Sequence, residues 1–295
     1  MKRAAVVVFL ILLGALGVMR YLSLDVLLYQ NWRLNSAAMP EPSLNLGRYR
    51  VDIEARVVEG LDDDLSALTY NRDRDSLATV INGEPLFLEL DLEGRILRRV
   101  RVEGVSDMEG IAHVDGNRYL IAEERAQRLL LVDIPDNAQS VDTRNAPSLR
   151  LALDDAGNKG IEGVTWDDIG QRVLVVKERD PLRLIAIEGF VNADAHAPAL
   201  RIAELQAEDS PGLFMSDLSS VSQHNATGHL LLLSDASHML VEYGANYEPI
   251  SLLGLWSGMS GLSATVPQAE GVTVDSQGRI YVVSEPNLFY RFVPH

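Results

Sequence analysis

Glutamate directly before glycine recurs at three widely separated places in the chain. The strings "MEGIA" from Met108, "IEGVT" from Ile161 and "AEGVT" from Ala269 each place this pair at the start of an apolar run. Two related strings, "LSALT" from Leu65 and "LSSVS" from Leu218, have serine in place of glutamate. Carboxylates and neutral oxygens are the ligands that hard cations such as Ca²⁺ prefer. The pattern indicates a cation site, provided that the fold brings the strings together.

A second oxygen-bearing position follows each string at a nearly constant distance. The residue in question ends the next apolar run, 15 or 16 positions after the second residue of the string. The five pairs are Ser66 with Asn82, Glu109 with Glu124, Glu162 with Glu178, Ser219 with Asp235, and Glu270 with Glu285. This constancy predicts one hairpin geometry used five times, in which the second strand ends beside the beginning of the first. We therefore expect an acidic ring at one end of a shared channel.

The charge of this ring must be compensated, because clustered carboxylates repel one another. A divalent cation is one solution, with Glu109, Glu162, Glu270, Glu124, Glu178, Asp235, Glu285 and Asn82 as candidate ligands. Further oxygens could come from Asp64, Asp107 and Asp217, and from Ser66, Ser219 and Ser284. Ca²⁺ is favoured over Mg²⁺ because it accepts about six to eight oxygen ligands in a wide site. Salt bridges from Lys177, Arg125 or Arg179 are the alternative, and the histidines lack the spacing of a zinc site.

The five strings belong to a repeat, since their second residues are separated by 43, 53, 57 and 51 positions. Each string continues through a polar turn, such as "DSQGR", into a second apolar run, and a third run follows in every copy. Most copies show a fourth run. Four short antiparallel strands per repeat are typical of a propeller blade. The sequence predicts an all-β, five-bladed β-propeller, with small residues where inner strands crowd around the channel.

The last copy supplies only three strands before the sequence ends at His295. A strand-like alternating segment, "RYRVDIEARVV" from Arg48 to Val58, precedes the first copy. We expect this segment to be the outer strand of the last blade, so that it closes the ring. Residues 48–295 would then form the propeller domain.

The first 30 residues have a different character from the repeats. The run from Ala4 to Met19 has no charged residue, and it is flanked by Lys2, Arg3 and Arg20. This pattern predicts one transmembrane helix within residues 1–30, with the propeller on the far side of the membrane from the cytoplasm. A cleaved signal peptide is the alternative, although a suitable small-residue site, "SAA" from Ser36, lies far downstream. Residues 31–47 are predicted to be a linker.

Charge and cysteine content exclude several classes of function. The formal net charge is −16, and the chain beyond residue 46 carries −18. Such a body repels phosphate backbones, which argues against nucleic acid as a partner, and it attracts cations. The absence of cysteine excludes disulfides, thiol catalysis and thiolate metal sites.

These strings resemble the SdiA-regulated domain proteins, also called the YjiK/CarP family. The resemblance runs from Gly47 to the end and is most specific in "PQAEGVTVDSQGRIYVVSEPNLFYRFVP". It implies a β-propeller in the periplasm, anchored to the inner membrane, with a link to calcium regulation in some members and a phytase-like description in others. We therefore expect a calcium-linked sensor, scaffold or homeostasis factor. The alternative is a Ca²⁺-dependent phytase-like or esterase-like hydrolase, and either protein could take a small ligand at the channel mouth.

Overall fold

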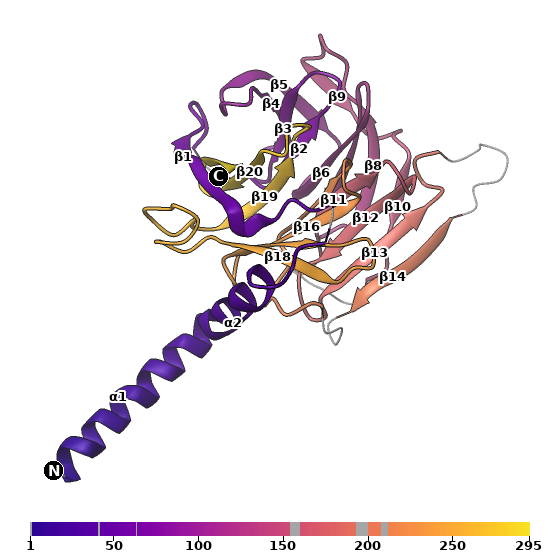
Figure 1. Ribbon diagram of the computed structural model, residues 1–295. Helices are drawn as coiled ribbons and strands as arrows, with labels where there is room; N and C mark the ends of the chain where they lie inside the picture. The colour runs from indigo at the N-terminus through magenta and orange to yellow at the C-terminus, as the bar shows by residue number, and fades with distance from the viewer. Residues whose placement is uncertain (1, 41, 63, 154–159, 193–199, 208–211) are drawn as a thin grey trace.

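Five small sheets stand around a central axis in the computed structural model of the chain (Figure 1). The structure describes residues 2–40, 42–62, 64–153, 160–192, 200–207 and 212–295. Four of the sheets contain four antiparallel strands that follow one another from the axis outward, which is the arrangement of propeller blades. The fifth sheet has the same four-stranded arrangement and one additional strand at its outer edge. The predicted all-β, five-bladed β-propeller is confirmed.

The blades are numbered here in chain order. Blade 1 contains β2 (Thr69–Asn71), β3 (Ser76–Ile81), β4 (Leu86–Leu90) and β5 (Ile96–Glu103), and blade 2 contains β6 (Met108–Asp115), β7 (Arg118–Glu123), β8 (Arg128–Asp133) and β10 (Ser148–Arg150). Blade 3 contains β11 (Ile161–Asp167), β12 (Arg172–Lys177), β13 (Arg183–Glu188) and β14 (Arg201–Ala207). Blade 4 contains β15 (Ser220–His224), β16 (His229–Ser234), β17 (Met239–Tyr243) and β18 (Pro249–Gly254). Blade 5 contains β19 (Ala269–Val274), β20 (Ile280–Ser284) and β21 (Leu288–Pro294), followed by the N-terminal strand β1 (Tyr49–Val57).

The middle strands of the blades are mostly apolar because both of their faces are covered. All six residues of β3 and all six of β16 are buried. Apolar side chains from neighbouring blades pack together in continuous clusters. The cluster between blades 1 and 2 includes Phe87, Val100, Ile121 and Leu130. Burying such side chains is the main stabilising contribution, about 1.5–3 kcal/mol for each large one.

The ring closes between the two ends of the propeller sequence. Strand β1 pairs antiparallel with β21, with Tyr49 opposite Pro294 and Val57 opposite Leu288. Two register irregularities, between Val51 and Ile53 and between Ile53 and Arg56, let the outer strand follow the twist of the blade. The expected closure by the segment before the first repeat is confirmed.

Deleting residues 48–58 should destabilise the whole domain, because β21 then becomes an open edge and the last blade loses its outer strand. We expect one cooperative melting transition at a clearly lower temperature, measured by circular dichroism. Deleting residues 2–19, which lie in the exposed helix α1 (Lys2–Tyr21), is the matched control and should leave the transition unchanged. A deletion of residues 48–58 that melts like the full chain would contradict closure by β1.

Blade 1 carries a fifth strand that the sequence did not predict. Strand β9 (Ser140–Asp142) leaves blade 2 and pairs in parallel with β5, with Arg101 opposite Ser140 and Glu103 opposite Asp142. The outer strand of blade 2 is then supplied by the short β10. This exchange joins the outer edges of two neighbouring blades.

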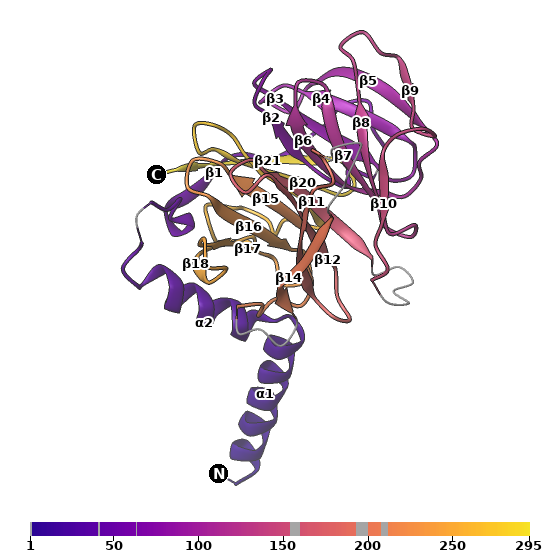
Figure 2. The same cartoon turned by 90° about the vertical axis from the view of Figure 1, so that its right-hand side faces the viewer.

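The N-terminal residues form two helices that meet at a bend of 71° (Figure 2). Helix α1 projects away from the propeller, whereas α2 (Leu24–Asn35) lies along blade 4. Among the described residues, no single helix is long and apolar enough to pass as a membrane span, although the bent pair passes together. The expected single transmembrane helix is therefore not confirmed.

The segment predicted to be a linker, residues 31–47, is held against the propeller for part of its length. Leu34 of α2 is buried, and Asn35 forms hydrogen bonds of 2.9 and 3.1 Å with the backbone of Leu252. The short 3-10 helix η1 (Leu46–Arg48) then leads into β1, with Leu46 fully buried. Packed structure thus begins before residue 48, because apolar side chains in a polar segment find a surface on blade 4.

The carboxylate of Glu242, in β17, fastens this segment to blade 4. It is fully buried and accepts hydrogen bonds from the backbone N–H groups of Leu44 and Asn45, at 2.7 and 3.1 Å. The Ser251 hydroxyl donates to the same carboxylate at 2.5 Å, and His229 Nδ1 lies 2.9 Å from it. The Glu242 carboxylate therefore contacts polar groups of both the N-terminal segment and blade 4.

Replacing Glu242 with Ala should destabilise the protein by at least about 3 kcal/mol, because each buried donor left without a partner costs about 1–3 kcal/mol. Urea denaturation would measure the loss. Glu248→Ala, at an exposed position near the end of the same blade, is the control and should change stability by less than about 0.5 kcal/mol. Equal stability of the two variants would show that the Glu242 contacts contribute little.

Candidate functional site

A β-bulge positions each of the three glutamates at the beginning of an inner strand. In β6, Met108 pairs with Glu123 and Gly110 with Ala122, so Glu109 between them has no partner in the ladder. The same irregularity brackets Glu162 in β11 and Glu270 in β19. A bulge redirects the side chain of the extra residue, and bulges are frequent beside functional sites. Here they turn the three carboxyl groups toward the channel.

The glycine after each glutamate is required by the close approach of the next blade. A Cβ atom on Gly163 would lie 2.9 Å from the backbone nitrogen of Val221. A Cβ atom on Gly271 would lie 2.7 Å from the carbonyl carbon of Ala67, across the junction of blades 5 and 1. Both distances are shorter than a side chain tolerates, so the glycines permit the packing that places the glutamates side by side.

The structure brings all eight predicted ligands to the lining of one cavity with a volume of about 270 Å³. The lining consists of Asn82, Glu109, Glu124, Glu162, Glu178, Arg179, Asp217, Ser219, Asp235, Gln268, Glu270 and Glu285. Eight carboxyl groups thus face one guanidinium group. This set of residues is called the acidic cavity below.

Hydrogen bonds satisfy part of the acidic cavity. The Asn82 amide donates to Glu109, and the backbone N–H of Gly160 donates to Glu124 at 3.2 Å. The backbone N–H of Ala269 donates to Asp235 at 3.0 Å. These contacts orient the carboxyl groups but bring no positive charge.

The three basic residues expected to compete with a cation lie in different places. Arg179 lines the cavity and forms an ion pair with Glu178. Lys177 is fully buried outside the lining, and its ammonium group donates to the carbonyl oxygens of Arg179 and Asp180 at 2.5 and 3.1 Å. Arg125 lies 3.5 Å from Asp107. Of the three, Arg179 alone contributes charge to the cavity lining.

Burial and mutual repulsion change the acidity of the carboxyl groups. Burial, followed by repulsion from Glu270 and Glu124, raises the pKa of Glu109 to about 9. Burial and the charge of Asp235 raise the pKa of Glu270 to about 8. The pKa of Glu162 is raised well above its ordinary value by burial and then by Glu109 and Glu124. Without a cation, Glu109 and Glu270 hold protons at neutral pH.

Two overlapping groups of carboxylates have the geometry to hold an ion. In each group, one oxygen from each residue lies within 4.8 Å of the others, which is about twice a Ca²⁺–oxygen bond length. One group is Asp107, Glu109 and Glu124, and the other is Glu124, Glu162 and Glu178. Glu124 belongs to both, so it occupies a position between two possible ion sites.

Gln268 lines the acidic cavity although no repeat position pointed to it. It lies two residues before Glu270, just as Asp107 precedes Glu109 and Asp217 precedes Ser219. Aligning these earlier positions would have found it, because the repeat places another oxygen-bearing residue there. Asp217 itself lines the cavity and accepts hydrogen bonds of 3.1 Å from the backbone N–H of Ala236.

A second cavity, of about 250 Å³, lies at the other end of the inner strands. Its lining includes threonine hydroxyls that join neighbouring blades: Thr69 accepts from the backbone N–H of His113 at 3.0 Å, and Thr165 accepts from that of Gln223 at 3.1 Å. Thr273 accepts from Tyr70 in the same way, at 2.9 Å. These hydroxyl groups connect inner strands of neighbouring blades that are not paired with each other in a β-sheet.

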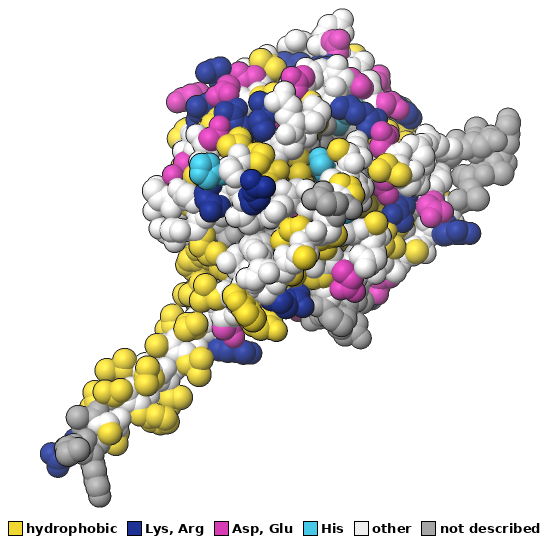
Figure 3. All heavy atoms as spheres, viewed as in Figure 1, with side chains coloured by type: hydrophobic (Ala, Val, Ile, Leu, Met, Phe, Trp, Pro, Cys, Tyr) yellow, Lys and Arg dark blue, Asp and Glu magenta, His cyan; other side chains and the backbone are white. Residues whose placement is uncertain are grey.

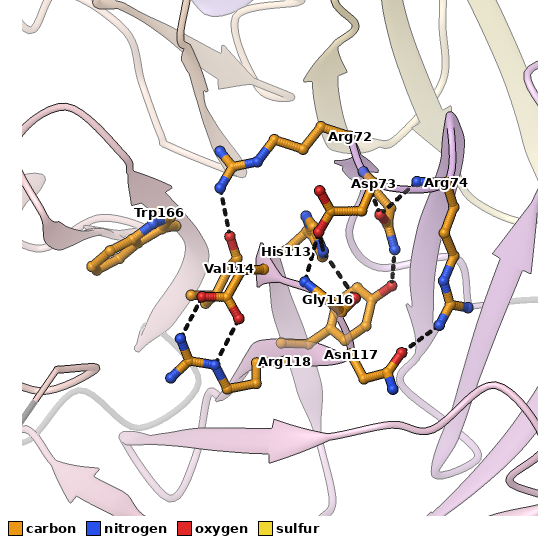
Figure 4. Close-up of polar contacts among 12 residues, drawn as sticks. Arg72, Asp73, Arg74, His113, Val114, Gly116, Asn117, Arg118 and Trp166 are labelled. Atoms are coloured by element: carbon orange, nitrogen blue, oxygen red, sulfur yellow. Dashed lines mark hydrogen bonds and ion pairs between the residues drawn. The ribbon is translucent and has the colours of Figure 1, made fainter.

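Side chains from blade 1 reach across blade 2 at the rim of this second cavity (Figure 4). Arg72 donates to the carbonyl oxygen of Val114 at 2.9 Å and forms a two-pronged ion pair with Asp168 of blade 3, at 2.6 and 3.1 Å. Asp73 accepts from the backbone N–H of Gly116 at 2.6 Å. Burial lowers the pKa of His113, so its imidazole is neutral at pH 7. The two ends of the channel therefore differ, since one is acidic and the other is lined mostly by neutral polar and aromatic groups, with Arg72 and Asp275 as its charged residues.

Comparison with known proteins identifies the sequence family and the fold. The sequence model of the SdiA-regulated family matches residues 41–293. Among solved structures, the glutaminyl cyclase of Myxococcus xanthus aligns with a TM-score of 0.52 at 11% identity, over 83% of this chain and 95% of that one. This likeness concerns the fold alone.

Two further solved structures align with lower TM-scores. The Cps50 (Swd1) β-propeller domain of Myceliophthora thermophila aligns with a TM-score of 0.43 at 15% identity, over 80% of this chain and 65% of that one. A nidogen/laminin complex aligns at 0.48 and 11% identity, over 76% and 73% of the two chains. The present chain thus spans just under two thirds of the length of the first of these proteins.

Proposed function

Since the chain belongs to the SdiA-regulated family, we propose a role that fits this membership and the acidic cavity. The protein binds Ca²⁺ in the acidic cavity and acts as a calcium-linked sensor, scaffold or homeostasis factor. The observation that carries this proposal is the imbalance of charge in a confined space, where eight carboxyl groups face one guanidinium. A site so rich in oxygen ligands matches the coordination preference of Ca²⁺. The ion would supply the positive charge that the surrounding protein groups do not.

Metal analysis and calorimetry of the purified protein test this proposal directly. We expect Ca²⁺ to bind and to release heat in a saturable titration, with Mg²⁺ binding more weakly because it demands a tighter octahedral site. A protein that carries no metal and gives no binding heat with Ca²⁺ would refute it.

A hydrolase that uses the same ion is the second candidate. Arg179 in the cavity lining favours it, because a guanidinium beside a bound cation can hold a phosphate or carboxylate group. Turnover of generic phosphate and carboxylic esters, with and without Ca²⁺, distinguishes this candidate from a sensor. Calcium-dependent turnover that disappears in Arg179→Ala would establish it, whereas binding without turnover would leave the sensor or scaffold.

The proposed location is the periplasm, with the N-terminal segment held in the inner membrane. Lys2 and Arg3 ahead of the apolar run support this orientation, because Lys and Arg beside a membrane segment favour the cytoplasmic side. A protease added outside spheroplasts should digest the propeller, and intact propeller after digestion would place it in the cytoplasm. The second cavity offers a place for a small ligand at a channel mouth.

A further inference from the structure

Helix α2 has two apolar faces, and the propeller covers one of them. Leu27 and Leu34, seven positions and thus about two turns apart, are buried in the cluster between blades 3 and 4. Leu28, Tyr29 and Trp32 project from the opposite face, with 51%, 57% and 66% of their surfaces exposed. A surface helix of a soluble domain normally carries polar residues on that face. The exposed face therefore needs a partner.

The neighbouring helix indicates what that partner is. Residues 6–9 of α1 are Val, Val, Val and Phe, and each is more than half exposed. Since consecutive residues of a helix point in all directions around its axis, α1 is apolar on every side. Figure 3 shows these hydrophobic side chains continuing from α1 onto the region of α2. A surface of this kind matches the hydrocarbon interior of a bilayer.

The composition of α2 fits the boundary of a bilayer rather than its interior. Tyr29 and Trp32 are amphipathic aromatic residues, which gather at the headgroup level of membranes. Arg33 is exposed beside them and can extend its guanidinium to lipid phosphates. Asp25 also lies on the outer side, but Arg20 pairs with it at 3.0 Å, so the pair brings no net charge to the surface.

We propose that α2 is an interfacial helix, with Leu28, Tyr29 and Trp32 embedded in the lipid headgroup region while Leu27 and Leu34 hold the propeller. This inference rests on the proposed membrane attachment and adds to it a fixed contact between propeller and bilayer. The 71° bend after α1 allows one helix to enter the bilayer while the other lies along its surface. The propeller would then be seated on the membrane and not suspended from a flexible tether.

The full chain in vesicles of phosphatidylethanolamine and phosphatidylglycerol provides the test. Flotation of the vesicles first reports whether the protein is attached at all. The fluorescence of Trp32 is then obtained as the difference between the wild type and Trp32→Phe, because the chain has three tryptophans. We expect lipids brominated near the headgroup to quench Trp32 more strongly than lipids brominated near the bilayer centre, and acrylamide in the water to quench it little. Trp166→Phe is the matched control and should leave the lipid-quenched signal intact.

The outcomes separate the two proposals. Protein that fails to float refutes membrane attachment, and the contact of α2 fails with it. Protein that floats, with Trp32 quenched by acrylamide and not by lipid, refutes the interfacial helix alone. Shielding of Trp32 from both quenchers would mean that a protein surface, such as a second copy of the chain, covers α2, which also overturns the proposal. A variant with Leu28→Asn and Tyr29→Asn should float but expose Trp32 to acrylamide.

Discussion

Replacing Glu109, Glu162 and Glu270 together with Gln should raise the melting temperature of the metal-free protein and abolish its response to Ca²⁺. The substitutions keep the shape of the three side chains and their ability to form hydrogen bonds. They remove carboxyl groups whose pKa values are raised first by burial and then by mutual repulsion. A stabilisation of a few kcal/mol corresponds to a shift of roughly 5–10 °C for a domain of this size. In the wild type, Ca²⁺ should stabilise the fold by about 2.7 kcal/mol at a hundredfold excess over its dissociation constant.

A second triple variant controls for the change in net charge. Glu59, Glu103 and Glu248 are exposed residues outside the acidic cavity, and their replacement with Gln removes the same number of charges. This variant should keep the calcium-dependent shift and gain little stability. If the cavity variant also keeps the shift, the ion binds elsewhere. If the wild type shows neither a shift nor binding heat, the carboxyl groups have a structural role only.

The stability of the metal-free protein should fall as pH rises from about 5 to 9. In the unfolded chain a glutamate loses its proton near pH 4.5, whereas the pKa values of Glu109 and Glu270 are about 9 and about 8 in the folded protein. Between these limits folding takes up protons, so raising the pH opposes it. The stabilisation is complete below about pH 4.5 and is lost as pH passes through the two folded-state values. Each pKa unit corresponds to about 1.4 kcal/mol, so the total effect is on the order of several kcal/mol.

Thermal melts of the wild type and the Gln triple variant across this pH range isolate the effect. The two proteins should melt at similar temperatures near pH 5 and diverge as the pH rises, with the variant more stable. Calcium should remove the divergence, because it replaces the bound protons, and the protons released can be measured by calorimetry in buffers of different ionisation enthalpy. Parallel pH profiles of the two proteins would contradict the raised pKa values.

The five sequence repeats made it possible to predict both the fold and the clustering of the site residues in one cavity. The near-constant separation between pairs such as Glu162 and Glu178 reflects one hairpin used in every blade, so one geometric argument applied to all five. The same regularity placed the closing strand before the first repeat. Whether the acidic cavity holds an ion stays a prediction, because residue types alone do not distinguish a bound cation from bound protons.

The features that escaped prediction are those set by tertiary contacts. The sequence around Ser140 to Asp142 has no strand pattern, and this segment forms β9 only because the edge of β5 is within reach. The bulges at the glutamates depend on strand register, which a single sequence does not reveal. The sequence did not predict α2 as a separate helix, because Leu27 and Leu34 follow a longer apolar run and precede a segment rich in Pro and Ser. Its buried face became evident only against blade 4.

The closure of the ring by β1 has a consequence for the order of folding. During synthesis β1 emerges from the ribosome before any blade, whereas its partner β21 follows all the other blade strands in the chain, as the pairing of Tyr49 with Pro294 shows. Contacts between such distant segments form slowly, because a long loop must close first. Blades 1 to 4 can assemble while the chain grows, but the ring closes only after β21 has been made. Until then β1 is an unpaired edge, and its charged residues Arg50, Asp52, Glu54 and Arg56 oppose pairing with other chains.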